Sequence, residues 1–139
     1  MIKMNVNTSE IISEQPRGFA GLIARIMEKL NDNPDFKESF KNVNRKYILN
    51  ATNLDWAAFI EINNGTIKVR SVPNKPRENL KKKVLGWDGF LEMDSRLFLK
   101  IALKRISFLK IGFKWITGKI KMKGITKLLT LLKIFNYLE

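Results

Sequence analysis

The chain has 139 residues and a mass of 16.1 kDa, which is the size of one domain with one core. Hydrophobic residues make up 45% of it and charged residues 28%, a composition typical of globular rather than disordered proteins. It contains no cysteine and no histidine. This excludes disulfides, thiolate metal sites, Cys or Ser/His nucleophile systems and acid/base catalysis by imidazole.

Positive charge is concentrated toward the C-terminus. The formal net charge is +13, from 26 Lys and Arg against 13 Asp and Glu, and residues 95–138 hold eleven basic residues and no acidic one. Such a field attracts anionic membranes or nucleic acids, although lysines that only aid solubility give the same composition. No stretch reaches the roughly 20 apolar residues of a membrane-spanning helix, and residues 1–18 lack the apolar segment of a secretory signal, so a cytoplasmic location is expected.

The N-terminal part predicts a leader followed by two helices. Residues 1–15 are polar with little periodicity, which predicts a flexible leader before a single domain over residues 16–139. Asn33 and Pro34 predict the start of the second helix, with Phe36 and Phe40 on its inner edge. Before it, apolar residues recur at the spacing of an amphipathic helix, at Phe19, Leu22, Ile23, Ile26, Met27 and Leu30.

Alternation with a period of two predicts three strands next, over residues 45–52, 54–62 and 66–72. Residues 63–65 (NNG) predict the turn between the last two, because Asn and Gly tolerate the positive φ that a hairpin requires. In the third strand, Ile67 and Val69 are expected to face inward and Lys68 and Arg70 outward. The second strand divides into one face with Trp56, Ala58, Ile60 and Ile62 and another with Asp55, Ala57, Phe59 and Glu61.

Residues 73–83 contain two prolines and a basic cluster, which favours a surface loop. A fourth strand is expected over residues 85–93, and Asp94 or Ser95 is expected to cap a helix that ends at residue 105. Residues 106–117 predict short helical turns. Residues 119–123 alternate as a fifth strand, with Ile120 and Met122 toward the core and three lysines away from it.

The last predicted helix, over residues 125–138, has an unusually wide apolar surface. At 100° per residue its apolar positions sweep about 220°, whereas about 100° or somewhat more suffices for burial on one side. The clear polar edge of the helix is limited to Thr126, Thr130, Lys133 and Tyr137. We therefore expect this helix to cover something besides its own sheet. A bound apolar ligand, a partner subunit and a bilayer surface all fit, and so does deep burial in an ordinary core.

Four short passages occur in the order in which a known family has them. They are residues 30–36 (LNDNPDF), 61–69 (EINNGTIKV), 90–99 (FLEMDSRLFL) and 113–124 (FKWITGKIKMKG), followed by the apolar helix. Together they resemble the sterol-carrier-protein (nonspecific lipid-transfer) domain family over residues 20–136. The chain departs from that pattern at Ile125, where the family often has Asn or Asp, and at Lys104 and Arg105, where the family often has a Gly-containing turn.

The resemblance implies an α+β fold in which a five-stranded mixed or antiparallel sheet has helices packed on one face, enclosing an apolar tunnel. It also implies binding and transfer of a lipid without catalysis, whether a sterol, a fatty acid, an acyl-CoA or an isoprenoid-type molecule. No cofactor, no metal and no catalytic residue belongs to that function. Partners would be the lipid itself and, transiently, an anionic membrane surface.

Such a tunnel needs inward apolar side chains from the sheet and the last helices. A carboxylate or phosphate head group at its mouth, or an anionic membrane, would meet Lys100, Lys104, Arg105 and Lys127. Each apolar candidate also fits an ordinary core. We expect the lining to include Leu91, Met93, Phe98, Ala102, Phe108, Ile111, Ile120, Met122, Leu128, Leu132 and Phe135.

Three alternatives are open at this point. A basic nucleic-acid-binding face would use Lys68, Arg70, Lys119, Lys121 and Lys123, with Phe59 or Phe90 to stack bases. An interaction domain would form a homodimer through the C-terminal apolar helix. An enzyme would have only carboxylates, Lys and Tyr for acid/base catalysis, and the closest carboxylate cluster, Asp88, Glu92 and Asp94, is expected to be solvent-facing cap and surface charge.

Overall fold

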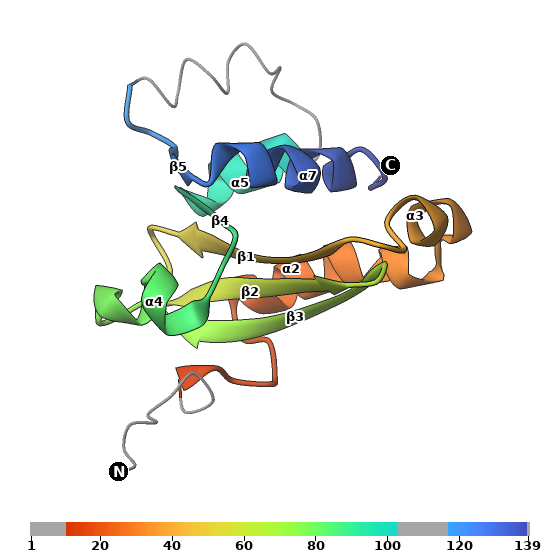
Figure 1. The fold of residues 1–139 in the computed structure, drawn as a ribbon. Coiled ribbons are helices and arrows are strands. Elements are labelled where there is room, and N and C mark those ends of the chain that lie inside the picture. The colour runs from red at the N-terminus through yellow and green to blue at the C-terminus, as the bar shows by residue number, and fades with distance from the viewer. Residues whose placement is uncertain (1–10, 103–116, 139) are drawn as a thin grey trace.

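Five strands form one sheet among residues 11–102 and 117–138, the part of the chain that this computed structural model describes (Figure 1). Their order across the sheet is β3 (Thr66–Pro73), β2 (Trp56–Asn63), β1 (Asn44–Ala51), β4 (Gly89–Met93) and β5 (Lys121–Lys123). β1 and β4 run parallel, and the other neighbouring pairs run antiparallel. The expected α+β class with a mixed five-stranded sheet is therefore confirmed.

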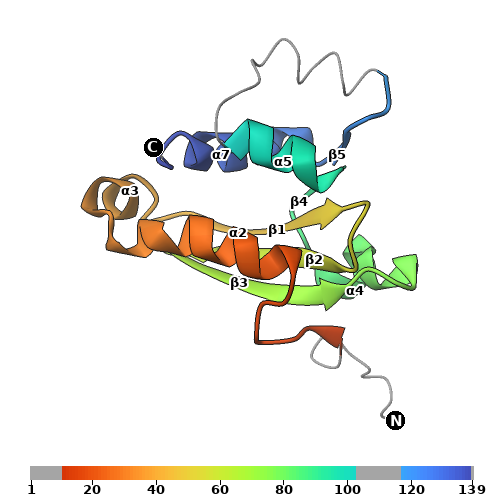
Figure 2. The same cartoon turned by 180° about the vertical axis from the view of Figure 1, so that it is seen from behind.

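The longer helices pack against one face of the sheet. α2 (Phe19–Met27) contacts β2 and β3, and α7 (Ile125–Phe135) contacts β4 and β5. α5 (Ser95–Ala102) follows β4 after one residue. Figure 1 shows α2 behind the sheet and the short α4 (Lys82–Leu85) in front of it, and Figure 2, the view from behind, shows α2 in front.

The face under these helices carries one apolar cluster, here called the inner cluster. β1 contributes Tyr47, Leu49 and Ala51 to it, each completely buried, because alternate residues of a strand point to the same face. Leu91 and Met93 of β4 continue the layer. The helices cover it with Phe19, Ala20, Ile23, Ala24 and Met27 of α2, Phe98 and Ile101 of α5, and Leu128, Leu131, Ile134 and Phe135 of α7.

The opposite face carries a second, smaller cluster, here called the outer cluster. Residues 73–83, expected as a surface loop, instead contain η3 (Arg77–Leu80) and the start of α4, and they fold back over the sheet. The reason is that Leu80 and Leu85 bury themselves beside Trp87, whose indole Nε1 donates to the carbonyl of Leu80 at 2.8 Å. Beneath them lie Ile48, Ala57, Phe59, Val72 and Phe90, all buried.

Local signals in the N-terminal part are confirmed. α2 continues into the 3₁₀ segment η2 (Glu28–Asp32), and α3 (Pro34–Ser39) begins at Asn33, whose side-chain oxygen accepts from the backbone N–H of Phe36 at 3.0 Å. Asn64 and Gly65 form the hairpin turn with φ of 52° and 82°. Residues 11–15 run beside β3, where Ser13 and Ser71 exchange backbone hydrogen bonds of 2.7 and 3.1 Å. The division at residue 15 stays a prediction.

Other boundaries differ from expectation. The fourth strand begins at Gly89 rather than at residue 85, because Leu85 ends α4. β5 covers residues 121–123 of the expected 119–123, with Ile120 buried and Met122 half-buried. The short turns expected over residues 106–117 fall almost entirely outside the described residues.

Glu92 is the one acidic side chain among the described residues that is buried, contrary to its expected solvent exposure. Its carboxylate accepts from Arg77 Nη1 and Nη2 at 2.9 and 3.2 Å and from Asn50 Nδ2 at 2.9 Å. Asn74 donates in turn to Asn50 Oδ1 at 2.9 Å. Burial alone would raise the pKa of Glu92, but the hydrogen bonds from Arg77 and Asn50 outweigh it and hold that pKa below its ordinary value of 4.5.

The start of α7 is held against the sheet at Gly124. Its φ of +71° suits glycine, and a Cβ placed there would lie 2.2 Å from the carbonyl oxygen of Asp88. One turn further, the Tyr47 hydroxyl donates to the carbonyl of Lys127 at 2.6 Å. Burial raises the pKa of Tyr47 to about 12, so this donor stays protonated at neutral pH.

We predict that Glu92→Gln lowers the free energy of unfolding at neutral pH by about 1–3 kcal/mol, because Arg77 and Asn50 lose the charge that they bind. A carboxyl group with a lowered folded-state pKa contributes stability above its unfolded value of 4.5 and loses it as the pH falls through the folded value. The difference between wild type and variant should therefore shrink below about pH 4.5. Urea unfolding across a pH series measures this. A constant difference down to acid pH would contradict it, and exposed Glu78→Gln is the control.

We predict that Gly124→Ala destabilises the protein more than Gly118→Ala. Both residues have positive φ, so both variants should lose about 1–2 kcal/mol from backbone strain. Only at Gly124 does the new methyl group meet another atom, since nothing lies within 4 Å of a Cβ at Gly118. The additional loss of stability in Gly124→Ala, about 1–3 kcal/mol, measures how tightly α7 packs against the sheet. Equal losses of stability for the two variants in thermal unfolding would show that this packing is loose.

Candidate functional site

The candidate site is the part of the inner cluster that lies between β4, β5 and the helices α5 and α7. It brings together most of the predicted lining residues. Met122 and Leu132 are partly buried against this cluster. Phe108, Ile111 and the side chain of Ala102 lie outside the described residues. The buried members are Leu91, Met93, Phe98, Ile120, Leu128 and Phe135, each 7% exposed or less.

Strand register explains why the sheet side of this layer is apolar. Leu91 pairs with Leu49 of β1 on one side and with Met122 of β5 on the other, so three apolar side chains form a row across the sheet. α5 then places Phe98 over the sheet, with its ring 5.0 Å from that of Phe19 of α2. The described members of the inner cluster therefore form one continuous apolar layer from α2 to α7.

Packing is closest at the N-terminal end of α7. A Cβ on Gly89 would come within 2.8 Å of Leu128 and 2.9 Å of Tyr47, so the backbone of β4 lies directly under these side chains. Together with the hydrogen bond from Tyr47 to Lys127, this close packing holds the N-terminal end of α7 on the sheet. The C-terminal end of α7 is more open, as the groove beside it shows.

An open groove lies at that other end, between α3 and α7. Its volume is about 480 Å³, and it was not anticipated from the sequence. Tyr137, which sequence spacing placed on a polar edge, instead packs edge-on against the rings of Phe36 and Phe40 at 5.7 and 5.8 Å and shares a 3.1 Å hydrogen bond with Ser39. The groove is lined by Ser39, Phe40, Val43, Thr130, Lys133, Asn136 and Tyr137.

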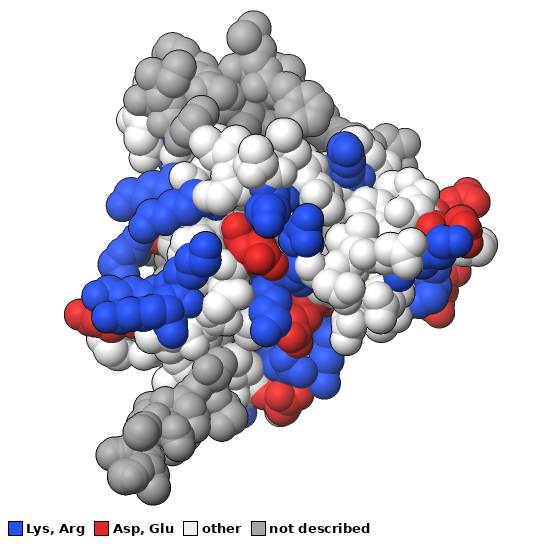
Figure 3. Space-filling model, in the orientation of Figure 1, with Lys and Arg blue, Asp and Glu red and all other residues white. Residues whose placement is uncertain are grey.

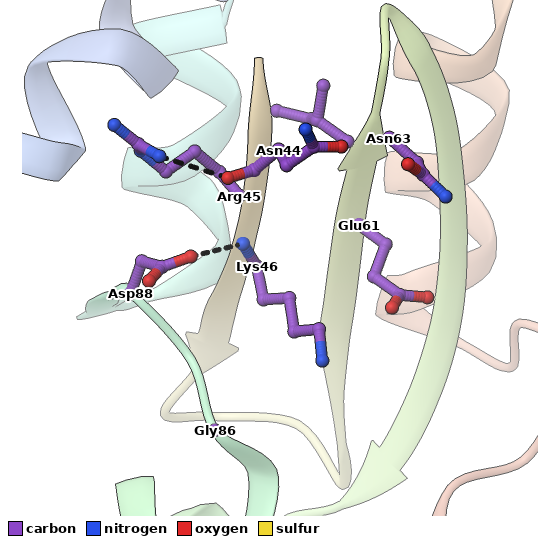
Figure 4. Close-up of a pocket in the computed structure, with 8 residues that line it drawn as sticks. Asn44, Arg45, Lys46, Glu61, Asn63, Gly86 and Asp88 are labelled. Atoms are coloured by element: carbon purple, nitrogen blue, oxygen red, sulfur yellow. Dashed lines mark hydrogen bonds between the residues drawn. The ribbon is translucent and has the colours of Figure 1, made fainter. Parts of the chain in front are cut away.

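A second hollow, of about 360 Å³, lies where β1 begins and β2 ends and is lined mainly by polar residues (Figure 4). Asp88 Oδ2 accepts from the backbone N–H of Lys46 at 2.8 Å, and Arg45 Nη1 donates to the carbonyl of Asn44 at 3.0 Å. These charged groups are used to hold the backbone, so they do not form a convergent acid/base pair. A hollow of this kind does not suit an apolar ligand.

Of the predicted head-group residues, Lys100 and Lys127 are exposed, and Lys104 and Arg105 lie outside the described residues. Within residues 11–102 and 117–138, no three acidic side chains gather as a metal site. No helix in the same ranges is both long and apolar enough to cross a bilayer.

The face expected for nucleic acid is divided by ion pairs. Lys68 and Arg70 of β3 lie 3.1 and 2.9 Å from the carboxylate of Glu14, and Arg70 also pairs with Glu61. Phe59 and Phe90, expected to stack bases, are each 3% exposed in the outer cluster. These rings are therefore not accessible to bases, while Lys119, Lys121 and Lys123 remain exposed.

Comparison with known proteins identifies the fold. No family model matches the sequence, and no curated protein matches it. Among solved structures, sterol carrier protein 2 from Yarrowia lipolytica in its apo form matches 90% of this chain and 96% of its own, with a TM-score of 0.56 and 20% identity. The ubiquinone synthesis protein UbiJ-SCP2 matches 86% of this chain and 89% of its own, with a TM-score of 0.59 and 9% identity.

An enzyme also contains this fold as a small part. The sec-alkylsulfatase Pisa1 from a Pseudomonas species matches 74% of this chain with a TM-score of 0.54 and 14% identity, but this chain spans only 14% of its length. The motifs of the sequence and the arrangement of the sheet thus agree with the same group of structures. The chain has the fold of the sterol carrier protein 2 domains.

Proposed function

We propose that this protein binds a lipid in the inner cluster and carries it, without catalysing a reaction. The observation that carries the proposal is the uninterrupted apolar layer between β4, β5, α5 and α7 in a chain with the sterol-carrier fold. The buried polar side chains Asn50 and Glu92 belong to the other face of the sheet, so the described part of the inner layer between these elements offers apolar side chains to an acyl chain or a sterol.

Transfer free energies are sufficient for such binding. Removing a methylene group from water contributes about 0.8 kcal/mol, so a long acyl chain gains on the order of 10 kcal/mol. Association and ordering cost about 4–15 kcal/mol. At the low end of that cost the net gain is about 6 kcal/mol, a Kd of tens of micromolar, so micromolar affinity, about 8 kcal/mol, requires further apolar contact or a polar anchor. A sterol, a fatty acid, an acyl-CoA and an isoprenoid-type lipid each carry enough apolar surface.

The ligand would lie among the predicted lining residues and enter from the groove between α3 and α7. Tyr137 and Phe40 line this groove, and the same side chains pack against the inner cluster. Lys133 also lines it and offers a cation to a carboxylate or phosphate head group. Lys100, Lys104, Arg105 and Lys127 would provide further positive charge toward the head group or the membrane.

We predict that Leu132→Trp weakens the binding of cis-parinaric acid, a fluorescent fatty acid, by about tenfold or more. Leu132 is half-buried against the inner cluster, and a larger side chain there would fill space that the ligand needs, at a cost of about 1–3 kcal/mol. The matched control is Val84→Trp, since Val84 is half-buried against the outer cluster. Fluorescence titration of both variants measures the difference.

Wild-type protein that binds no cis-parinaric acid, and that carries no lipid in native mass spectrometry, would contradict the proposed function. Equal weakening by Val84→Trp and Leu132→Trp would place the ligand elsewhere than in the inner cluster. Thermal unfolding of both variants distinguishes a filled site from a damaged fold.

A further inference from the structure

Exposed lysines gather over α4 and β5, on the side of the sheet away from the inner cluster. Figure 3 shows Lys and Arg concentrated over these two elements. The exposed members, here called the lysine face, are Lys81, Lys82 and Lys83 at α4 and Lys119, Lys121 and Lys123 at β5.

The two halves of the lysine face share one hollow. A depression of about 220 Å³ is lined by Arg77, Glu78, Leu80, Lys81, Trp87, Phe90 and Lys123. The Lys123 ammonium group lies 5.6 Å from the centre of the Phe90 ring, and that of Lys82 lies 5.8 Å from the Trp87 ring. Both ammonium groups thus lie over nearly buried aromatic rings, in cation–π contacts at the surface of the outer cluster.

Little acidic charge offsets this face. Glu92 lies beneath it but is buried and already holds Arg77 and Asn50, and Lys121 lies 4.0 Å from it. Glu78 is exposed at the rim of the hollow. At the β3 end of the sheet, by contrast, Glu14 and Glu61 pair with the basic side chains.

Exposed aliphatic residues follow these lysines closely in the chain. α7 begins two residues after Lys123, and in its first turns Ile125 is 43% and Leu129 is 53% exposed. Their spacing of four residues places them on one side of the helix, while Leu128 between them points into the inner cluster. Exposed Lys127 belongs to the same turns.

We propose that the lysine face, together with Ile125 and Leu129, is the surface with which this protein docks on an anionic lipid bilayer. Aliphatic side chains that enter the interface, surrounded by lysines that meet anionic head groups, are what interfacial binding requires. A single-stranded nucleic acid needs accessible aromatic rings, and Trp87 and Phe90 are covered. The proposal rests on the proposed function, since a carrier must meet a membrane to exchange its lipid.

The test compares three variants of the full chain by flotation with vesicles of phosphatidylcholine alone or mixed with phosphatidylglycerol. The double variant with Lys121→Gln and Lys123→Gln should weaken binding to the anionic vesicles about 25-fold, because each lysine contributes about fivefold to the affinity. Leu129→Gln should weaken it about fivefold, because the half-exposed leucine no longer enters the interface. The charge-matched control is Lys29→Gln with Lys41→Gln, in η2 and just after α3, at the other end of the sheet (Figure 1).

Each outcome decides the proposal. Support requires binding to anionic vesicles that added salt weakens, loss in the two face variants and no loss in the control. Equal binding to neutral vesicles, no effect of the face variants, or equal loss in the control would overturn it. Tighter binding to a single-stranded oligonucleotide than to vesicles, lost in the same lysine variant, would also overturn it and assign the face to nucleic acid.

Docking and cargo binding can fail separately. Titration with cis-parinaric acid in the absence of vesicles measures the proposed function alone, and the face variants should leave it unchanged. A protein that binds the fatty acid but no vesicle would overturn the docking surface and keep the carrier. Should Lys121→Gln with Lys123→Gln unfold, Lys81→Gln with Lys83→Gln tests the other half of the same face.

Discussion

The seat of α7 on β1 and β4 is the contact on which the rest of the structure depends. Gly124 lies against the carbonyl of Asp88, and the Tyr47 hydroxyl holds the carbonyl of Lys127 one turn later. This fixes the rotation of the helix about its own axis. Leu128, Leu131, Ile134 and Phe135 then face the sheet, and Ile125 and Leu129 face outward. The wide apolar surface of this helix is thus divided between the interior and the exterior.

The two faces of the sheet differ in what they can bind because their covers differ. The inner face is covered by α2, α5 and α7 and carries mainly apolar side chains among the described residues, with half-buried Arg45 toward its edge. The outer face is covered by η3 and α4, which are four residues each and leave the carboxylate of Glu92 to be matched by Arg77 from above and Asn50 from beside it. A buried charge needs such partners in fixed positions. The outer face therefore holds charged groups in fixed positions, whereas the inner face is suited to an apolar ligand.

Sequence periodicity predicted those elements whose signal is local. The cap at Asn33, the turn at Asn64 and the strand alternation all depend on neighbours within a few residues, and the structure has each of them. It missed η3 and α4, because four residues form a single turn and show no helical period. The sequence patterns also did not predict the burial of Phe59, Phe90 and Glu92. These residues are covered by the segment that forms η3 and α4, and those helical turns were not predicted.

The same dependence on local patterns explains which residues of the candidate site were predicted correctly. Alternation correctly placed Leu91 and Met93 inside, whereas Tyr137 was assigned to a polar edge because helical spacing takes no account of α3, which packs beside it. The composition adds a constraint on regulation. With no histidine in the chain, no side chain has an ordinary pKa near neutrality. Attraction between the lysine face and a bilayer would therefore change with the charge of the lipids and the salt around them, rather than with small changes in pH.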